Sequence, residues 1–350
     1  MTKQTWTAAV SAALFVVLAA LIALIPVPFV TWSPGSTADL LGQVGEREAI
    51  TISGARTFPT SGELRMTTVS VTAPGVTLSL PEVLFAYWLP AREVLPKDTV
   101  YQPGKDATEI SQIESQRMVE SQSSAVVAGL RQSGIEVTSW PRVIEVFTSG
   151  ASVGILEPGD LIKAVDGTAT HTVQDVRDVI LSENRHPGDP VLFTVLRNDL
   201  VLKLTVITRA TTNEPDKPIV GINMDVGYSY APTVEFAVDP AVGGSSAGLM
   251  FALAISDRLV SADIAAGRVI AGTGTVTSEG NVGAIGGVQE KIAAAVTDHA
   301  TIFVLPRANC ADAGTPDPSI RLLPVDTLAE ATDSLAKLAD PAEAGSVAGC

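Results

Sequence analysis

The stretch Gly243–Asp257, GGSSAGLMFALAISD, sets two glycines and two serines directly before an apolar run. Gly243 and Gly244 allow the backbone to turn sharply, and a serine at a helix start can cap the first N–H groups. The apolar residues from Leu249 to Leu259 predict a buried helix. The stretch is therefore either the capped start of a core helix or a helix start that presents a serine nucleophile.

A serine nucleophile needs a general base, which another part of the chain must supply. Histidine fits poorly, because His299 is the only histidine after residue 213 and lies late in a predicted helix. Lysine is the other base known to activate serine, and the same region contains Lys217, Lys291 and Lys337. Lys217 lies in a polar, proline-containing stretch and Lys337 near the polar end of the chain, which leaves Lys291.

Lys291 stands in GAIGGVQEKIAAAV, in the first turns of a predicted helix rich in alanine and isoleucine. The positive end of a helix dipole disfavours an ammonium group, and burial against Ile292 and Ala295 would disfavour it further. Both effects lower the pKa of the lysine and favour a neutral amine that can accept a proton. An exposed first-turn lysine beside Glu290 is the alternative interpretation.

Together the two stretches resemble the proteolytic domain of Lon-type serine proteases. Gly244–Gly248, GSSAG, matches the G-x-S-A-G of that family, which implies that Ser246 is the nucleophile. Gly286 and Gly287 open a match to the family's G-G-x-x-E-K, which implies that Lys291 is the general base.

The resemblance extends to a T-G pair at Thr273-Gly274, which implies that the Thr273 hydroxyl helps to hold the lysine amine. Ser245 departs from the family, which usually has proline there, and it leaves a second hydroxyl beside Ser246. The resemblance covers about residues 219–338, and the ATPase part of Lon is missing.

The middle of the chain, Val143–Ala210, resembles a PDZ domain through the segment LEPGDLIKAVDG at Leu156–Gly167. Pro158-Gly159 predicts a turn and Asp166-Gly167 a hairpin bend.

PDZ domains can bind a peptide as an added strand. The resemblance implies such a role for Val143, Ile144, Glu145 and Val146. The preceding residues Ser139–Arg142 are SWPR rather than the usual glycine-rich loop. A rigid module without peptide binding is therefore an open alternative.

The N-terminal region has no charged residue between Lys3 and Asp39. Residues 8–30 are long enough to cross a bilayer as a helix, and a cleaved signal peptide is the alternative. Lys3 before the span and acidic residues after it favour a cytoplasmic N-terminus, with the rest of the chain outside. In that oxidising compartment Cys310 and Cys350 can form a disulfide, although two unpaired thiols are the other interpretation.

Composition limits the function classes. A net charge of −15 argues against nucleic acid as a partner. No pair among the three histidines and two cysteines has the spacing of a zinc site, and no P-loop motif occurs. We therefore expect no metal, no cofactor and no ATP. The expected partners are protein or peptide substrates and the membrane, reached through one helix, while a homo-oligomer is left open.

The predicted fold class is α+β multidomain, with a transmembrane helix, a mixed α/β segment, a PDZ-like β-barrel and a Lon-type α/β proteolytic domain. The expected parts are a cytoplasmic N-terminus (1–7), a transmembrane helix (8–30), an extracytoplasmic mixed α/β segment (31–134), a PDZ-like domain (135–210), a linker (211–218), the proteolytic domain (219–340) and a C-terminal tail (341–350).

Four local elements are also expected: a turn-rich stretch at Trp32–Gly35, a strand at Gly62–Val71, and helices at Leu80–Pro90 and Ile110–Gly134.

This arrangement resembles the membrane-anchored, PDZ-containing Lon-like proteases of bacteria. The resemblance implies an ATP-independent serine endopeptidase that cleaves unfolded or flexible exported proteins. A membrane-tethered PDZ scaffold with an inactive Lon-type domain is the alternative.

Overall fold

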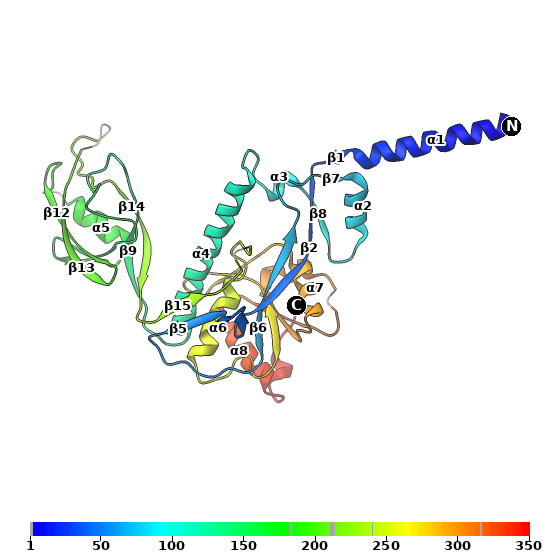
Figure 1. Cartoon of the computed structure of the whole chain (residues 1–350). Helices are drawn as coiled ribbons and strands as arrows, with labels where there is room; N and C mark the ends of the chain where they lie inside the picture. Colours follow the sequence, from blue (N-terminus) through cyan, green and yellow to red (C-terminus); the bar gives the residue numbers. More distant parts are fainter. Residues whose placement is uncertain (1–2, 183, 211–213, 240, 316) are drawn as a thin grey trace. The chain divides into compact units, whose positions relative to one another are not determined.

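The computed structural model describes residues 3–182, 184–210, 214–239, 241–315 and 317–350 (Figure 1). The chain divides into two compact units, one made of Met1–Gly134 with Pro232–Cys350 and the other of Ile135–Ala231. The second unit is therefore an insertion within the sequence of the first.

The elements of the first unit are, in chain order, α1 (Lys3–Leu24), β1 (Pro26–Val27), β2 (Phe29–Asp39), β3 (Gln43–Val44), β4 (Arg47–Glu48), β5 (Ile50–Ser53), β6 (Glu63–Val71), β7 (Leu78–Ser79), α2 (Leu80–Trp88), β8 (Glu93–Pro96), α3 (Lys97–Val100), α4 (Ala107–Gln132), β15 (Thr233–Phe236), α6 (Gly248–Leu259), β16 (Val269–Gly272), β17 (Thr275–Val276), β18 (Val282–Gly283), α7 (Val288–Thr297), β19 (Ile302–Pro306), the 3₁₀ turns η1 (Arg307–Asn309) and η2 (Ala311–Ala313), β20 (Arg321–Val325), α8 (Leu328–Ala339) and η3 (Ala344–Ser346).

The N-terminal helix α1 is long and apolar enough to cross a membrane, with a mean hydropathy of 2.6 over its best window, although a signal sequence would have the same character. It ends at Leu24, short of the expected residue 30. Pro26 and Pro28 explain the difference, because proline disfavours helical backbone in the residue before it and lacks the N–H that a helix interior needs. The residues expected to form a turn, Trp32–Gly35, lie inside strand β2 instead.

The centre of the first unit is a six-stranded sheet with the strand order β20-β19-β16-β6-β2-β8. The expected strand near residues 62–71 is confirmed as β6, and it pairs in parallel with β16, with Leu64 opposite Ile270. Strands β6 and β8, and all of β2 except its first two residues, come from the segment 31–134. That segment is therefore not a separate part, because it supplies half of the sheet that also contains the strands after residue 232.

Helices α6 and α7 both pack on this sheet, and α4 packs on α6 (Figure 1). Helix α6 is buried from Gly248 to Asp257. The crossing of α4 and α6 is close at Gly129, where an added Cβ would lie 2.8 Å from Cγ2 of Ile255 and 3.0 Å from the Ala252 carbonyl oxygen. Glycine is needed there because the two helices leave no room for a side chain.

The second unit contains β9 (Thr138–Val146), β10 (Leu161–Val165), β11 (Thr168–Ala169), α5 (Val173–Ile180), β12 (Pro190–Arg197), β13 (Leu200–Ile207) and β14 (Ile222–Ser229). Its sheet has the order β13-β12-β10-β9-β14, with β11 paired to β10. The predicted hairpin bend is present, since Asp166 and Gly167 have φ values of 49° and 80° between the paired residues Val165 and Thr168. Positive φ at both central residues is the type I′ hairpin geometry.

Strand β14 changes the expected boundary of the proteolytic domain. Residues from 219 onward were expected to belong to that domain, but β14 pairs antiparallel with β9 and the second unit extends to Ala231. The linker expected at 211–218 contains residues 211–213, which lie outside the described residues, and Ile219 forms a bridge to Arg209.

The same pairing corrects the expected peptide-binding edge. Residues Val143–Val146 lie in β9, which has β10 on one side and β14 on the other. Met224, Asn223 and Ile222 stand opposite this segment. The edge of this segment that faces β14 is therefore already paired, and the strands at the two ends of the sheet are β13 and β14.

We expect Gly129→Ala to destabilise the protein by about 1–3 kcal/mol, because the new methyl group would collide with α6. At a helical glycine with free space around it, the same substitution would instead stabilise the protein, since alanine favours a helix by about 1 kcal/mol over glycine. Thermal melts of the full chain in detergent would measure the change. Gly75→Ala is the control, because nothing lies within 4 Å of its added Cβ. An unchanged or raised melting temperature for Gly129→Ala would contradict the close crossing.

Candidate active site

Ser246 lies in the loop that leads into α6. Gly244 turns the chain with φ of 89°, a conformation that side chains other than glycine rarely adopt. The residue that precedes the helix is Ala247, and no side chain caps α6. Neither Ser245 nor Ser246 therefore has the capping role that their position suggested. Ser246 is half-buried.

Lys291 meets Ser246 across the unit. Its Nζ lies 2.9 Å from Oγ of Ser246 and 3.1 Å from Oγ1 of Thr273. Residues 246, 273 and 291 come from the start of α6, the end of β16 and the first turn of α7, respectively. The structure thus brings together the three side chains that the motifs single out.

The amine of Lys291 is held in an apolar setting. The residue is 3% exposed, and burial lowers its pKa to about 8, against a smaller opposing effect of the neighbouring Glu290 carboxylate. Burial has this direction because the charged form loses its hydration. A substantial fraction of Lys291 is therefore neutral near pH 8, as a general base requires.

Thr273 fixes the geometry between the two other residues. Its hydroxyl donates to the Ser246 carbonyl oxygen at 3.0 Å and accepts from Nζ of Lys291. The N–H of Gly274 donates to the same carbonyl at 2.8 Å. Thr273 is fully buried, so this arrangement is shielded from competing water. The backbone of Ser246 and the lysine amine are consequently tied to one side chain.

The Gly286-Gly287 pair sets the start of α7 close to the N-terminal strands. Gly287 has φ of 69°. A Cβ on Gly286 would lie 2.8 Å from the Trp32 ring, and one on Gly287 would lie 2.6 Å from Cγ2 of Val69. The turn before Lys291 is thus packed against β2 and β6, and glycine is required because a side chain would push α7 away.

Helix α4 also supports the nucleophile loop, a role that the sequence did not reveal. The N–H of Gly244 donates to the Glu114 carbonyl oxygen at 3.0 Å. The Ser121 hydroxyl donates to the Ser245 carbonyl oxygen at 2.9 Å. The only indication in the sequence was Ser121, a serine on the face of α4 that becomes buried. A small polar residue on a buried helix face is common and does not by itself indicate a functional site.

A hollow of about 250 Å³ lies beside Ser245 between α4 and β17. It is lined by Arg117, Glu120, Ser121, Ser124, Ser245, Thr275 and Val276. The hollow gives the region next to Ser246 room for a neighbouring chain segment.

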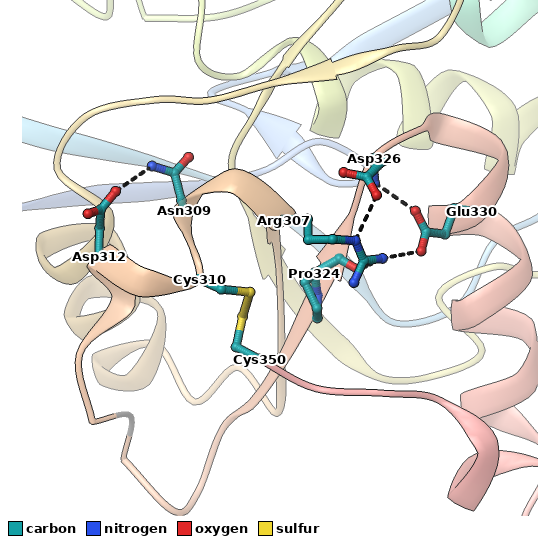
Figure 2. Close-up of a disulfide and its surroundings, with 8 residues drawn as sticks. All are labelled: Arg307, Asn309, Cys310, Asp312, Pro324, Asp326, Glu330 and Cys350. Atoms are coloured by element: carbon teal, nitrogen blue, oxygen red, sulfur yellow. Dashed lines mark hydrogen bonds and ion pairs between the residues drawn. A yellow bond between two sulfur atoms is a disulfide. The ribbon is translucent and has the colours of Figure 1, made fainter.

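The loop between β19 and β20 holds the other side of the Gly286-Gly287 turn. The Asn309 side chain accepts from the N–H of Ile285 at 3.0 Å and donates to its carbonyl oxygen at 2.9 Å. A disulfide joins Cys310, the next residue, to Cys350 at the end of the chain (Figure 2). The disulfide therefore ties the C-terminal tail to the loop that holds the start of α7.

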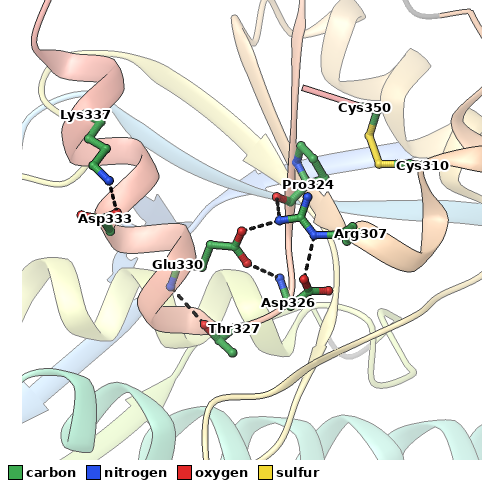
Figure 3. Close-up of polar contacts among 9 residues, drawn as sticks. All are labelled: Arg307, Cys310, Pro324, Asp326, Thr327, Glu330, Asp333, Lys337 and Cys350. Atoms are coloured by element: carbon green, nitrogen blue, oxygen red, sulfur yellow. Dashed lines mark hydrogen bonds and ion pairs between the residues drawn. A yellow bond between two sulfur atoms is a disulfide. The ribbon is translucent and has the colours of Figure 1, made fainter. Parts of the chain in front are cut away.

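A cluster around Arg307 joins the same loop to α8 (Figure 3). The guanidinium of Arg307 donates to Asp326 at 2.7 Å, to the Pro324 carbonyl oxygen at 3.1 Å and to Glu330. Glu330 also accepts from the N–H of Asp326 at 2.7 Å. These side chains are largely exposed, so their contribution to stability is modest, but together they align η1, β20 and the first turn of α8.

The alternative base considered from the sequence, His299, does not lie at this site. His299 is exposed at the end of α7 with φ of 59°, away from the start of the helix where Lys291 lies. Within the described ranges, no group of three or more His, Cys, Asp and Glu side chains is placed to hold a metal ion.

Each of the two compact units contains a segment that matches a known protein family. Residues 237–334 match the Lon protease (S16) C-terminal proteolytic domain, and residues 116–208 match the PDZ domain. The first match contains Ser246, Thr273 and Lys291. The second begins inside α4, whereas the compact unit begins at Ile135, because α4 packs on α6 of the first unit.

Solved structures similar to the chain include PDZ domains. The PDZ domain of the SdrC-like protein from Listeria monocytogenes is 26% identical, with a TM-score of 0.22, over 24% of this chain and 86% of that one. Its counterpart from Listeria innocua is 26% identical, with a TM-score of 0.22, over 24% of this chain and 92% of that one. No curated protein matches the chain. On the two family matches, the chain is a mixed α/β protein that combines a Lon-type proteolytic domain with a PDZ domain.

Proposed function

We propose that this protein is an ATP-independent serine endopeptidase, anchored in the membrane by α1, that uses Ser246 as nucleophile and Lys291 as general base. The observation that carries the proposal is the 2.9 Å distance between Nζ of Lys291 and Oγ of Ser246, with the amine buried. A lysine serving only structure would gain nothing from this setting, because burial disfavours its charged form. Desolvated lysines beside a hydroxyl are instead suited to proton transfer.

The reaction follows from these positions. The neutral amine of Lys291 takes the proton of the Ser246 hydroxyl while Oγ attacks the carbonyl carbon of the scissile peptide bond. Backbone N–H groups of the loop at Ser246 would stabilise the resulting oxyanion, since those of Gly248 and Leu249 already donate to carbonyl oxygens. The intermediate collapses as the Lys291 ammonium returns the proton to the leaving amine, and an acyl-enzyme on Ser246 remains. Water, deprotonated by Lys291, then releases the acid and restores the serine.

The substrate class follows from what the chain contains. No P-loop motif occurs within the 350 residues, and the proposed cleavage does not use ATP. Substrates must reach Ser246 as extended segments of unfolded, flexible or already cleaved proteins. The hollow beside Ser245 would accept part of such a segment.

The orientation proposed for the chain has the N-terminus in the cytoplasm and both compact units outside. The disulfide between Cys310 and Cys350 supports this orientation, because disulfides persist in oxidising compartments. The apolar α1 would then be the membrane anchor.

The test of the dyad is the rate at which a serine-directed probe acylates Ser246 as a function of pH. We expect the rate to rise along one limb with a midpoint near pH 8, because Lys291 loses its proton around that pH. Lys291→Arg should not react, since arginine keeps its proton, while it retains a long cationic side chain. Lys337→Arg is the matched control, because Lys337 is half-buried on α8 and pairs with Asp333 at 2.7 Å, away from the dyad.

Equal acylation of wild type and a folded Lys291→Arg would disprove the proposed base. A folded wild type that neither reacts with the probe nor cleaves an unfolded protein would instead favour the scaffold alternative. Thermal melts establish folding in each case.

Helix α4 gives a second prediction. Ser121→Ala removes a hydrogen bond to the Ser245 carbonyl oxygen, and we expect peptide cleavage to slow about three- to tenfold, since one such bond contributes about 1 kcal/mol. The loss should appear in kcat, and the pH midpoint should not move because Lys291 is untouched. Ser123→Ala should be silent, because that exposed hydroxyl donates to Val119 of its own helix and not to the nucleophile loop. A Ser121→Ala enzyme with unchanged kcat would show that α4 does not position the nucleophile loop.

The two cysteines report the orientation directly, since the chain contains no others. Cells are denatured in a thiol-reactive polyethylene glycol reagent, and the mass shift of the chain is read before and after reduction. We expect no shift before reduction and two added groups after it. Cys350→Ser should accept one group without reduction. Two added groups on the wild type before reduction would contradict an exported catalytic unit.

A further inference from the structure

Helix α2 exposes an apolar face. Leu84, Phe85 and Trp88 are 45%, 64% and 76% exposed, and with Pro81 they occupy positions i, i+3, i+4 and i+7. This spacing places all four residues on one side of the helix. A helix on a water-exposed surface normally carries polar residues on its outward side. An outward apolar stripe of this kind needs a partner.

The exposure is not the result of a loosely held helix. Val83 and Ala86, on the opposite side, are 7% and 4% exposed, and α2 packs against β2 and β8. Its start is fixed by a capping box, in which the N–H of Ser79 donates to the Glu82 carboxylate at 2.7 Å. The buried side therefore fixes which residues face outward.

The face lies beside the end of the proposed membrane anchor. Strand β7, directly before α2, pairs antiparallel with β1, directly after α1, with Ser79 opposite Pro26 and Leu78 opposite Val27. Neighbouring strands are about 5 Å apart, so α2 begins one strand spacing from the point where the chain leaves α1 (Figure 1). Helices α1 and α2 are also in contact.

We propose that α2 is an interfacial helix whose outward face, made of Pro81, Leu84, Phe85 and Trp88, inserts into the headgroup–acyl boundary of the membrane that α1 crosses. This inference rests on the proposed anchoring by α1. Tryptophan and apolar residues on one side of a short helix favour that depth of a bilayer. Little independent affinity is needed, because the anchor already holds α2 at the surface.

The contacts of α2 give this docking a structural consequence. Strands β2 and β8 belong to the sheet of the proteolytic unit, and Trp32 of β2 packs on the turn before Lys291. Insertion of α2 would therefore hold this unit by two points, α1 and α2, and fix its height and rotation above the membrane.

The test uses the full chain in phosphatidylcholine vesicles whose acyl chains are brominated close to the headgroups, since bromine quenches tryptophan fluorescence on contact. The difference between wild type and Trp88→Phe gives the fluorescence of Trp88 alone. The other tryptophans, including Trp32 inside the unit, are present in both proteins. We expect the Trp88 signal to fall at least about twofold relative to unbrominated lipid.

Trp6 of α1, which is 67% exposed, separates the inference from the anchoring on which it rests. Its signal, isolated with Trp6→Phe, should also be quenched. Quenching of Trp6 without quenching of Trp88 would leave the anchor standing and overturn the interfacial role of α2. If Trp88 were then also shielded from aqueous acrylamide, a protein surface would cover the face instead. If neither Trp6 nor Trp88 were quenched, the anchoring by α1 would itself be overturned.

Discussion

The buried amine of Lys291 is the constraint on which the arrangement of the first unit depends. A fall in its pKa from 10.5 to about 8 corresponds to about 3 kcal/mol, at about 1.4 kcal/mol per pH unit. Because the folded pKa is lowered, the unfolded chain binds this proton between pH 8 and 10.5 while the folded chain does not, so stability rises with pH across that window. Below pH 8 the fold carries the full cost, which packing elsewhere must offset.

That packing comes from segments far apart in the chain. Strand β6 lies beside β16, whose end leads into Thr273, and Trp32 of β2 closes the turn before Lys291. Helix α4 holds the loop before Ser246 through Glu114 and Ser121. The residues that would perform the chemistry all follow Pro232, but several of the elements that keep them in place precede residue 135. The Lon-type match alone, residues 237–334, therefore does not contain the whole environment of the proposed dyad.

The sequence predicted what short-range patterns encode. Strand β6 and helices α2 and α4 were found from apolar spacing and end signals, and the Asp166-Gly167 hairpin from its turn residues. Pairings between distant segments were not predictable, because β6 with β16 and β9 with β14 leave no local periodicity. The early end of α1 was predictable, since Pro26 and Pro28 stood in the sequence. The role of Ser121 was not, because its partner is a carbonyl 124 positions away.

The PDZ unit is connected to the first unit at two points of the chain, through α4 and through β15. The chain enters this unit from α4, which donates from Ser121 to the Ser245 carbonyl, and leaves it into β15. Phe236 of β15 packs edge-on against Phe251 of α6, with ring centroids 5.0 Å apart. Both covalent connections of the PDZ unit thus lead to elements that contact α6 or the loop before it.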